Sequence, residues 1–475
     1  MATLNYNEAA HLMRRAAFGG TPDEIDDLSA RGREGAVDYL INFGQIDNTP
    51  LEDLLKASFN FSTQDNMNNG EIRRWWFTRL VVSKRQFEEK MTLFWHNHFA
   101  TSSSKVQDFF MYFQNTLLRQ YALDRFDNLL LKASQDAAML IWLDNITNVL
   151  GKPNENFGRE LQELFTMGIN DVVTGDQNYT EQDVKEVARC FTGWNYVRRA
   201  PYAFQLTISQ HDNASKSLFP GKPWAATGNL SGEDVITLIS ARAATARYLT
   251  WKLFNFFVYP VTDSTADKAT IDKFAQVYLT NNHSIKELVR AIFTSDEFFS
   301  ERAFFSLVKQ PVELVVGAVR MLGGTYNPGS TVATPVRTSN ILSTMARNMG
   351  QDLFAPPDVA GWDFNLGFVN TASMLERFNF ANAFVNNRNT TNPGIFVTND
   401  QLKSITKPSA KKTVRRFLSR LGPLSVGEAV GTLRTYLETA DNGQPATYVN
   451  DDATVNKEIR GLVHQIMCLP EFQLN

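Results

Sequence analysis

Residues 71–99 read EIRRWWFTRLVVSKRQFEEKMTLFWHNHF, and this stretch decides the fold class. The pattern predicts two helices, 71–82 and 86–99, separated at Ser83. The second helix carries a stripe along one face, at positions i, i+4, i+7 and i+11: Phe87, Met91, Phe94 and His98. Because a spacing of 3.6 residues places such positions on one side of a helix, this stripe faces a core.

The same helical period recurs along the chain and predicts an all-α, multi-helix globular body with minimal β structure. Thr21, followed by Pro22 and three residues later by Glu24, is a capping signature that starts a helix. We expect further helices over 233–258 and 301–322.

Strand signal is scarce and is confined to Ala203–Ser209, which alternates modestly. It lies in a long irregular stretch, 192–230, which we interpret as a loop insertion on the helical body. Loops of this length without their own structure are usually functional or disordered.

The chain divides by composition. Residues 1–386 form a predicted helical core domain that carries the insertion. Residues 387–412 are rich in Asn, Thr, Lys and Pro and have the composition of a linker. Residues 413–475 are expected to be a C-terminal helical segment packed on the core.

The composition argues against several classes of protein and of metal site. Lys and Arg number 47 against 50 Asp and Glu, which gives a net charge of −3 in 475 residues and argues against a nucleic-acid binder. No apolar run approaches the ~18 residues of a membrane span, and none near the start forms a signal-peptide core. The cytoplasm is therefore the default location, with export alongside a folded partner left open. Two cysteines cannot build a four-thiolate zinc site.

Three histidines are candidate metal ligands. His96 and His98 close the second helix of the quoted stretch, about 200° apart around its axis, so they converge only if the helix ends near His96. His211 lies beside Asp212 in the long loop, where a histidine next to a carboxylate can act as base or ligand. The alternative is a buried core histidine at 98 and an ordinary polar loop at 211.

A polar stripe follows the segment NENFGRELQELF. Its members fall at i, i+3, i+4 and i+7: Asn156, Arg159, Glu160 and Glu163. Carboxylates one turn apart can divide acid and base roles or bind a hard cation. With nitrogen and oxygen ligands the favoured divalent metals are Zn, Fe and Mn. The alternative is a solvated helix face.

Asp183 is a third candidate acid. It follows Thr180 by three residues, and this spacing is also explained by helix capping alone.

Several motifs together resemble the bacterial "domain of unknown function 1800" family over nearly the whole chain. They are HLMRRAAFGGTP (11–22), MTLFWHNHFATSSSKV (91–106), AAMLIWLDN (137–145), NENFGRELQELFTMG (154–168), YTEQDVKEVARCFTGW (179–194), HDNASKSLF (211–219), APPDVAGWDF (355–364) and the terminal PEFQLN. The resemblance implies a mostly helical fold. It also implies a partner from the neighbouring family 1501, whose members resemble sulfatase-like exported proteins. Some members carry His where this chain has Phe165, so a carboxylate–histidine pair at that position cannot form here.

Two functions follow from these patterns. The first is an enzyme with a polar, metal-binding pocket, in which Glu160, Glu163 and Asp183 are catalytic and His96, His98 and His211 are ligands. The second is a non-catalytic helical scaffold or partner protein for a family-1501 protein. In that case the network around Asn156 and Arg159 would lock helices together.

Overall fold

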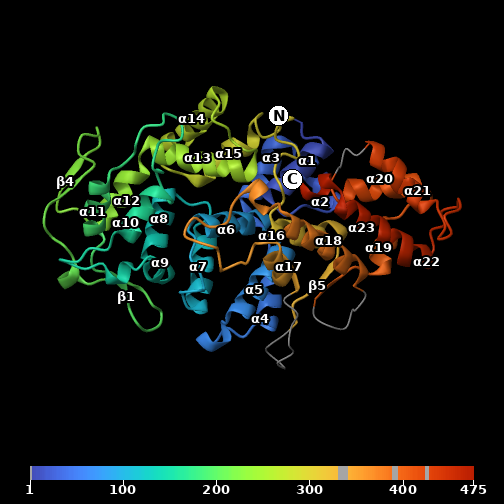
Figure 1. Cartoon of the computed structure of the whole chain (residues 1–475), viewed down its shortest axis with the longest axis horizontal. Coiled ribbons are helices and arrows are strands. Elements are labelled where there is room, and N and C mark those ends of the chain that lie inside the picture. The colour runs from blue at the N-terminus through green and yellow to red at the C-terminus, as the bar shows by residue number, and fades with distance from the viewer. Residues whose placement is uncertain (1–2, 330–340, 388–393, 423–426) are drawn as a thin grey trace.

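Helices build most of the molecule, which confirms the all-α prediction. The computed structural model describes residues 3–329, 341–387, 394–422 and 427–475. In Figure 1 the helices spread along the long axis, with the first helices near the middle, and short strands lie at the periphery. Among the described residues, no helix is both long and apolar enough to cross a bilayer.

The helices fall into three groups along the chain. The first group is α1 (Tyr6–Ala16), α2 (Pro22–Ala30), α3 (Gly32–Ile41), α4 (Thr49–Ser58), α5 (Asn69–Val82), α6 (Gln86–His98), α7 (Asp108–Gln120), α8 (Phe126–Gln135) and α9 (Ala137–Trp142). The second is α10 (Glu155–Glu163), α11 (Glu181–Cys190), α12 (Gly232–Ser240), α13 (Ala243–Phe257), α14 (Thr265–Thr280) and α15 (Ile285–Thr294). The third is α16 (Pro311–Leu322), α17 (Ile341–Asn348), α18 (Thr371–Asn386), α19 (Asn399–Ile405), α20 (Ala410–Arg420), α21 (Gly427–Leu437), α22 (Asp452–Thr454) and α23 (Arg460–Cys468). Figure 1 places α10–α12 at one end of the molecule and α19–α22 at the other, with α6 and α16 between them.

A buried carboxylate ties the central helices together. Glu89 of α6 is fully buried and accepts hydrogen bonds from Arg79 of α5 (3.0 Å) and Arg119 of α7 (2.8 Å). The indole of Trp76 donates to the same carboxylate at 3.1 Å. A buried charge is tolerated when it is paired and hydrogen-bonded in this way. These bonds fix α5, α6 and α7 relative to one another.

The strands form short antiparallel hairpins. β1 (Trp194–Tyr196) pairs with β2 (Phe204–Leu206), and β3 (Lys216–Leu218) pairs with β4 (Ala226–Gly228). Both hairpins belong to the predicted insertion, 192–230, which runs along the outside of the helical body at one end (Figure 1). A third pair, β5 (Thr325–Asn327) with β6 (Gly394–Phe396), joins segments that are distant in sequence.

The stretch predicted as one helix over 233–258 is two helices, and side chains donate hydrogen bonds to the backbone carbonyls at the break. The Oη atom of Tyr278 donates to the carbonyl of Ser240 (2.8 Å), and Oγ1 of Thr245 donates to the carbonyl of Ile239 (2.7 Å). α12 therefore ends at Ser240, and α13 starts in a new direction.

The helix predicted over 301–322 begins only at Pro311. Proline fits the first helical turn but disfavours helical backbone in the residue before it. Gln310 is accordingly extended and forms a capping box with Glu313. The residues upstream form irregular turns, in which Phe305 has a left-handed backbone with φ of 50°.

The C-terminal region contains more structure than its composition indicates. Residues 388–393 of the predicted linker lie outside the described residues. The rest of that segment contains β6, α19 and the start of α20, and a capping box between Thr398 and Gln401 begins α19. Farther on, α23 packs against α18. The division of the chain into a core, a linker and a C-terminal segment stays a prediction.

Candidate functional site

Two carboxylates lie one turn apart on α10. Glu160 is half-buried, and the Oε2 atom of Glu163 accepts a hydrogen bond from Tyr179 Oη at 3.1 Å. Within the described ranges, neither Glu160 nor Glu163 forms an ion pair with a lysine, arginine or histidine. Two half-buried carboxylates without a cationic partner on one helix face, one of them with a raised pKa, are a candidate for function.

Burial and the charge of Glu163 shift the pKa values of Glu160, Tyr179 and Tyr248. Burial raises the pKa of Glu160, the charge of Glu163 raises it further, and Arg159 opposes both. Burial and the charge of Glu163 likewise raise the pKa values of Tyr179 and Tyr248. The two phenols therefore stay protonated at neutral pH, and Tyr179 remains a donor to Glu163.

A buried lysine and a buried histidine hold the backbone that follows α10. The Nζ atom of Lys252 donates to the carbonyl of Leu164 at 3.3 Å, and burial lowers the pKa of this amine to about 8. The Nε2 atom of His98 lies 3.1 Å from the carbonyl oxygen of Phe165. Because a carbonyl only accepts, Nε2 carries the proton. Burial first, and then the charge of Lys252, lowers the pKa of His98.

His96 faces the opposite side of α6, because the helix continues through His98. Its Nε2 atom accepts a hydrogen bond from the backbone N–H of Phe354 at 3.1 Å, and burial lowers its pKa to about 3. The neighbouring Asn97 accepts from the N–H of Trp362 (2.7 Å) and donates to its carbonyl (3.2 Å). His96 and Asn97 thus clamp the segment 352–364 onto α6.

The three predicted histidine ligands have separate surroundings. His96 contacts Phe354, His98 contacts Phe165, and His211 contacts Thr192. Over the described ranges, no group of three or more His, Cys, Asp or Glu side chains is placed to hold one ion. Metal binding by these histidines stays a prediction.

The two remaining members of the α10 stripe point elsewhere. Arg159 binds Glu181 of α11 through two bonds of 2.7 Å and also contacts Glu155. Asn156 is exposed, and its backbone N–H donates to Asn154, the cap of α10. Arg159 therefore fastens α10 to α11.

Asp183 is buried and fully engaged in structure. Its Oδ2 atom accepts from the N–H (2.8 Å) and hydroxyl (2.7 Å) of Thr180, and its Oδ1 atom accepts from the N–H of Phe219 (2.7 Å). It completes the predicted capping box of α11 and anchors the insertion after β3. These contacts agree with the capping alternative, and a catalytic role for Asp183 stays a prediction.

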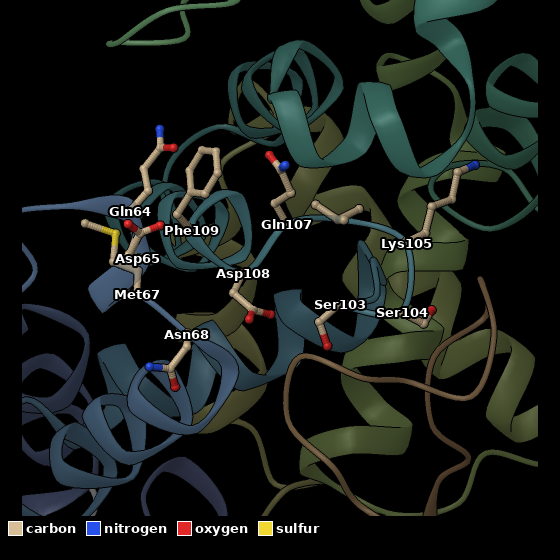
Figure 2. Close-up of a pocket in the computed structure, with 11 residues that line it drawn as sticks. Gln64, Asp65, Met67, Asn68, Ser103, Ser104, Lys105, Gln107, Asp108 and Phe109 are labelled. Carbon is tan, nitrogen blue, oxygen red and sulfur yellow. The ribbon is translucent and has the colours of Figure 1, made fainter.

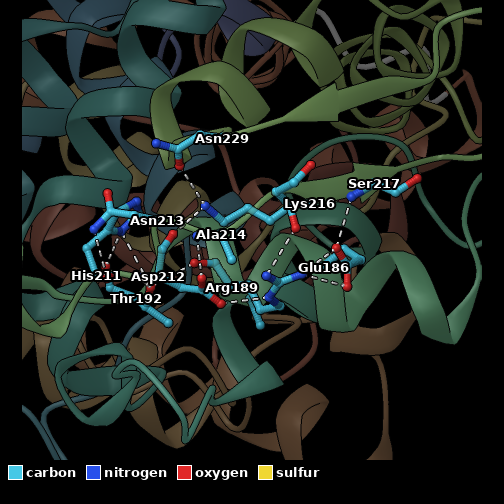
Figure 3. Close-up of polar contacts among 12 residues, drawn as sticks. Glu186, Arg189, Thr192, His211, Asp212, Asn213, Ala214, Lys216, Ser217 and Asn229 are labelled. Carbon is cyan, nitrogen blue, oxygen red and sulfur yellow. Dashed lines mark hydrogen bonds and ion pairs between the residues drawn. The ribbon is translucent and has the colours of Figure 1, made fainter.

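His211 and Asp212 fasten the insertion to the end of α11 (Figure 3). The Nδ1 atom of His211 donates to the carbonyl of Thr192 at 2.8 Å, and Asp212 accepts from Arg189 Nε at 2.7 Å. Arg189 also binds Glu186, and the hydrogen bond and charge of Arg189 lower the pKa of Asp212. This network connects one turn of helix to one loop.

A polar pocket that the sequence analysis missed lies between α5 and α7 (Figure 2). It has a volume of about 480 Å³ and is lined by two loop segments, Gln64–Asn68 without Asn66, and Ser103–Phe109. The carboxylate of Asp108 at its wall accepts from the N–H of Asn69 (2.8 Å). Ser103 donates its backbone N–H to the carbonyl of Phe354, so the clamped segment 352–364 supports the pocket from behind. The run of serines at 102–104, between two helices, was the available signal.

Comparison with protein families gives one match. A model described as "Protein of unknown function (DUF1800)" covers residues 11–474, nearly the whole chain. Comparisons with curated proteins and with solved structures found no match.

Proposed function

The chain belongs to the DUF1800 family, and we propose that it is an enzyme that uses Glu160 and Glu163 for acid–base catalysis. The observation that carries this proposal is the unpaired carboxylate pair on α10, with a phenol donating to one member. Carboxyl groups with shifted pKa values are typical of functional sites, and burial together with the like charge of Glu163 raises the pKa of Glu160.

The two carboxyl groups have different surroundings and therefore suit different roles. Glu160 has a raised pKa, so it is the group that would donate a proton. Glu163 is held as an acceptor by Tyr179, so it is the group that would take a proton from a nucleophile such as water. The class of reaction is one in which one acid and one base act together, as in the hydrolysis of a polar substrate.

Neighbouring groups support this assignment. Lys252 has a pKa of about 8 and binds the carbonyl next to Glu163, and His98 binds the following carbonyl. Together they fix the C-terminal end of α10, which positions Glu163. Groups with shifted pKa values that gather around one helix end are typical of active sites.

The test is a screen of the purified protein against chromogenic esters, glycosides, phosphate esters and peptides. Glu160→Gln and Glu163→Gln should each lower any turnover by roughly 100-fold or more, the usual share of a general acid or base. The matched control is Glu155→Gln on the same helix, because Glu155 pairs with Arg159. Turnover that none of these variants changes would overturn the proposal.

A second readout needs no substrate. Side-chain carbonyl NMR of Glu160 as a function of pH should show a pKa above that of an ordinary glutamate. In Glu163→Gln this pKa should fall, because the like charge is gone. An unshifted Glu160 carboxyl in the native protein would contradict the acid role.

A second candidate function is that of a partner protein for a family-1501 protein, as the sequence resemblance implies. One exposed apolar surface favours it: Leu150, Leu206 and Ile208 are 54 %, 40 % and 74 % exposed. The N–H of Leu150, which precedes the insertion in the chain, donates to the carbonyl of Gln210 (2.7 Å), so Leu150 lies beside the segment that carries Leu206 and Ile208. Co-expression with the family-1501 neighbour tests it. Ile208→Asp should abolish co-purification, and Leu375→Asp, at another exposed apolar position, should not.

A further inference from the structure

Five cationic side chains are buried where α1, α6, α16 and α18 meet. We call them the cation cluster: Arg14, Arg15, Lys90, Lys309 and Arg377. Each is at most 3 % exposed. They lie within electrostatic reach of one another, because burial first and then the charges of Arg14 and Arg377 lower the pKa of Lys309. The charge of Arg14 likewise adds to burial in lowering the pKa of Arg15.

One carboxylate faces these five cations. Glu313 forms an ion pair with Lys90, and its Oε2 atom accepts from Gln310 N–H (2.8 Å) and Asn475 Nδ2 (2.9 Å). In the part of the chain that the structure describes, no other carboxylate pairs with the cation cluster. Buried charge without a counter-charge is costly, so the cluster lacks negative charge.

Arg14 is the member without hydrogen bonds. Backbone carbonyls accept bonds from Arg15, Lys309 and Arg377. In contrast, the Nε and both Nη atoms of Arg14 are buried and have no partner in the described structure. Burial lowers the pKa of Arg14 to about 9, so it is still charged at neutral pH.

An aromatic ring lies over Arg14. The guanidinium carbon of Arg14 lies 4.5 Å from the ring centroid of Phe305. Phe305 is partly exposed, and its φ of 50° is a conformation that bulky side chains rarely adopt. The partly exposed Phe305 ring therefore lies against a buried guanidinium whose N–H groups have no hydrogen-bond partner in the described structure.

We propose that the cation cluster is a binding site for a small oxyanion of the phosphate or sulfate class, which Arg14 holds through its free N–H groups. A guanidinium presents parallel donors that match two oxygens of such an anion, and Lys309 lies within electrostatic reach of it. The anion reaches Arg14 when the Phe305 ring swings outward. The site is separate from Glu160 and Glu163, so neither proposal depends on the other.

The first experiment uses the full-length protein purified without phosphate or sulfate. It is denatured in acid, and the released anions are measured by ion chromatography, with mass spectrometry to separate an inorganic ion from a phosphate ester. The same preparation is titrated with sodium phosphate, sodium sulfate and, at equal ionic strength, sodium chloride while the unfolding temperature is recorded. Release of an oxyanion in proportion to the protein, or a rise in unfolding temperature with phosphate or sulfate but not with chloride, supports the site. The absence of both overturns it.

Variants test whether the oxyanion binds at Arg14. In Arg14→Met the apparent Kd for phosphate should rise about 10-fold or more, the factor that corresponds to one lost charge-assisted bond. Without oxyanion, this variant should unfold at the same temperature as the native protein or higher, because an unpaired buried charge is gone. The control, Arg31→Met, removes an exposed arginine that pairs with Asp27 and should change neither quantity.

If Arg14→Met does not fold, Phe305→Ala still tests the site, because it leaves every cation in place. Removing the cover should speed phosphate uptake and release. Native-like exchange in Phe305→Ala, together with an unchanged phosphate affinity in Arg14→Lys, would contradict the proposed site.

Discussion

The Nε2 atom of His98 donates a hydrogen bond to the backbone carbonyl of Phe165, 3.1 Å away. This bond joins the end of α6 to the backbone just after the carboxylates of α10. Two segments that the sequence analysis singled out separately, 96–98 and 154–165, therefore meet. They meet through a backbone group, so His98 is a positioning residue for Glu163.

The buried histidines should make stability depend on pH. Burial holds the pKa values of His11, His96 and His98 below the usual one in the folded state, whereas in the unfolded chain they titrate near pH 6.5. Below that pH the unfolded state binds more protons, so stability falls as the pH drops from about 6.5, by about 1.4 kcal/mol per pH unit for each histidine. Urea unfolding between about pH 7 and pH 5 measures this slope. His96→Gln should flatten it, because the variant removes one of the three buried histidines.

The buried charge network of α6 predicts different effects for two adjacent glutamates. Glu89→Gln should cost about 3–5 kcal/mol, because it leaves Arg119 buried without its counter-charge and Arg79 with only the partly exposed Glu52. Glu88→Gln should lie within about 1 kcal/mol of the native protein or stabilise it at pH 8. Burial and the charge of Glu89 already raise the pKa of Glu88 to about 7. Chemical denaturation measures both, and equal losses would mean that Glu89 is not the centre of the network.

A glycine at the clamped segment should not tolerate a side chain. A Cβ atom at Gly361 would collide with the side chain of Asn97 and lie 2.6 Å from its backbone oxygen, at a φ of +87°. Gly350 has a similar φ of +100° with open space around it. Gly350→Ala therefore measures the backbone strain alone, about 1–2 kcal/mol. Gly361→Ala should cost at least about 2 kcal/mol more through the collision. Similar unfolding free energies for the two variants would show that Asn97 moves aside freely.

Loss of the capping residue Asp183 of α11 should destabilise the fold more than loss of an equivalent capping residue on another helix. Asp183 and Asp234 both complete capping boxes, but Asp183 also accepts from the N–H of Phe219. Asp183→Ala should therefore destabilise by about 1–3 kcal/mol more than Asp234→Ala, since it also strands a buried donor. If Asp183→Ala instead abolished activity without loss of stability, Asp183 would belong to the catalytic group.

Residue spacing and capping residues predicted those helices whose boundaries depend only on nearby residues in the sequence. The helix expected over 86–99 is α6, and the capping residues Thr21 and Thr180 begin helices as predicted. The break at Ser240 was missed because it depends on Tyr278, a side chain from another helix. Propensity within one segment contains no information about such a donor.

The candidate site was predictable only in part. The spacing of Glu160 and Glu163 identified a carboxylate pair, but the partners of His96 and His98 lie 258 and 67 positions away. Contacts of that range follow from the packing of the whole chain. The burial of Arg14 was missed for a related reason: an Arg-Arg pair is usually solvated, and only the packing of α1 against α2, α6 and the segment 298–306 encloses it.

The last turn of α6 holds two other segments of the chain in place. His96 and Asn97 bind residues Phe354 and Trp362, and His98 binds Phe165, so consecutive positions hold segments that are distant in the sequence. A slip of this helix by one residue would rotate every one of these groups by about 100° and break all three attachments at once. One insertion or deletion within α6 should therefore be far more damaging than a substitution at any of its positions, because it breaks the attachments to both segments.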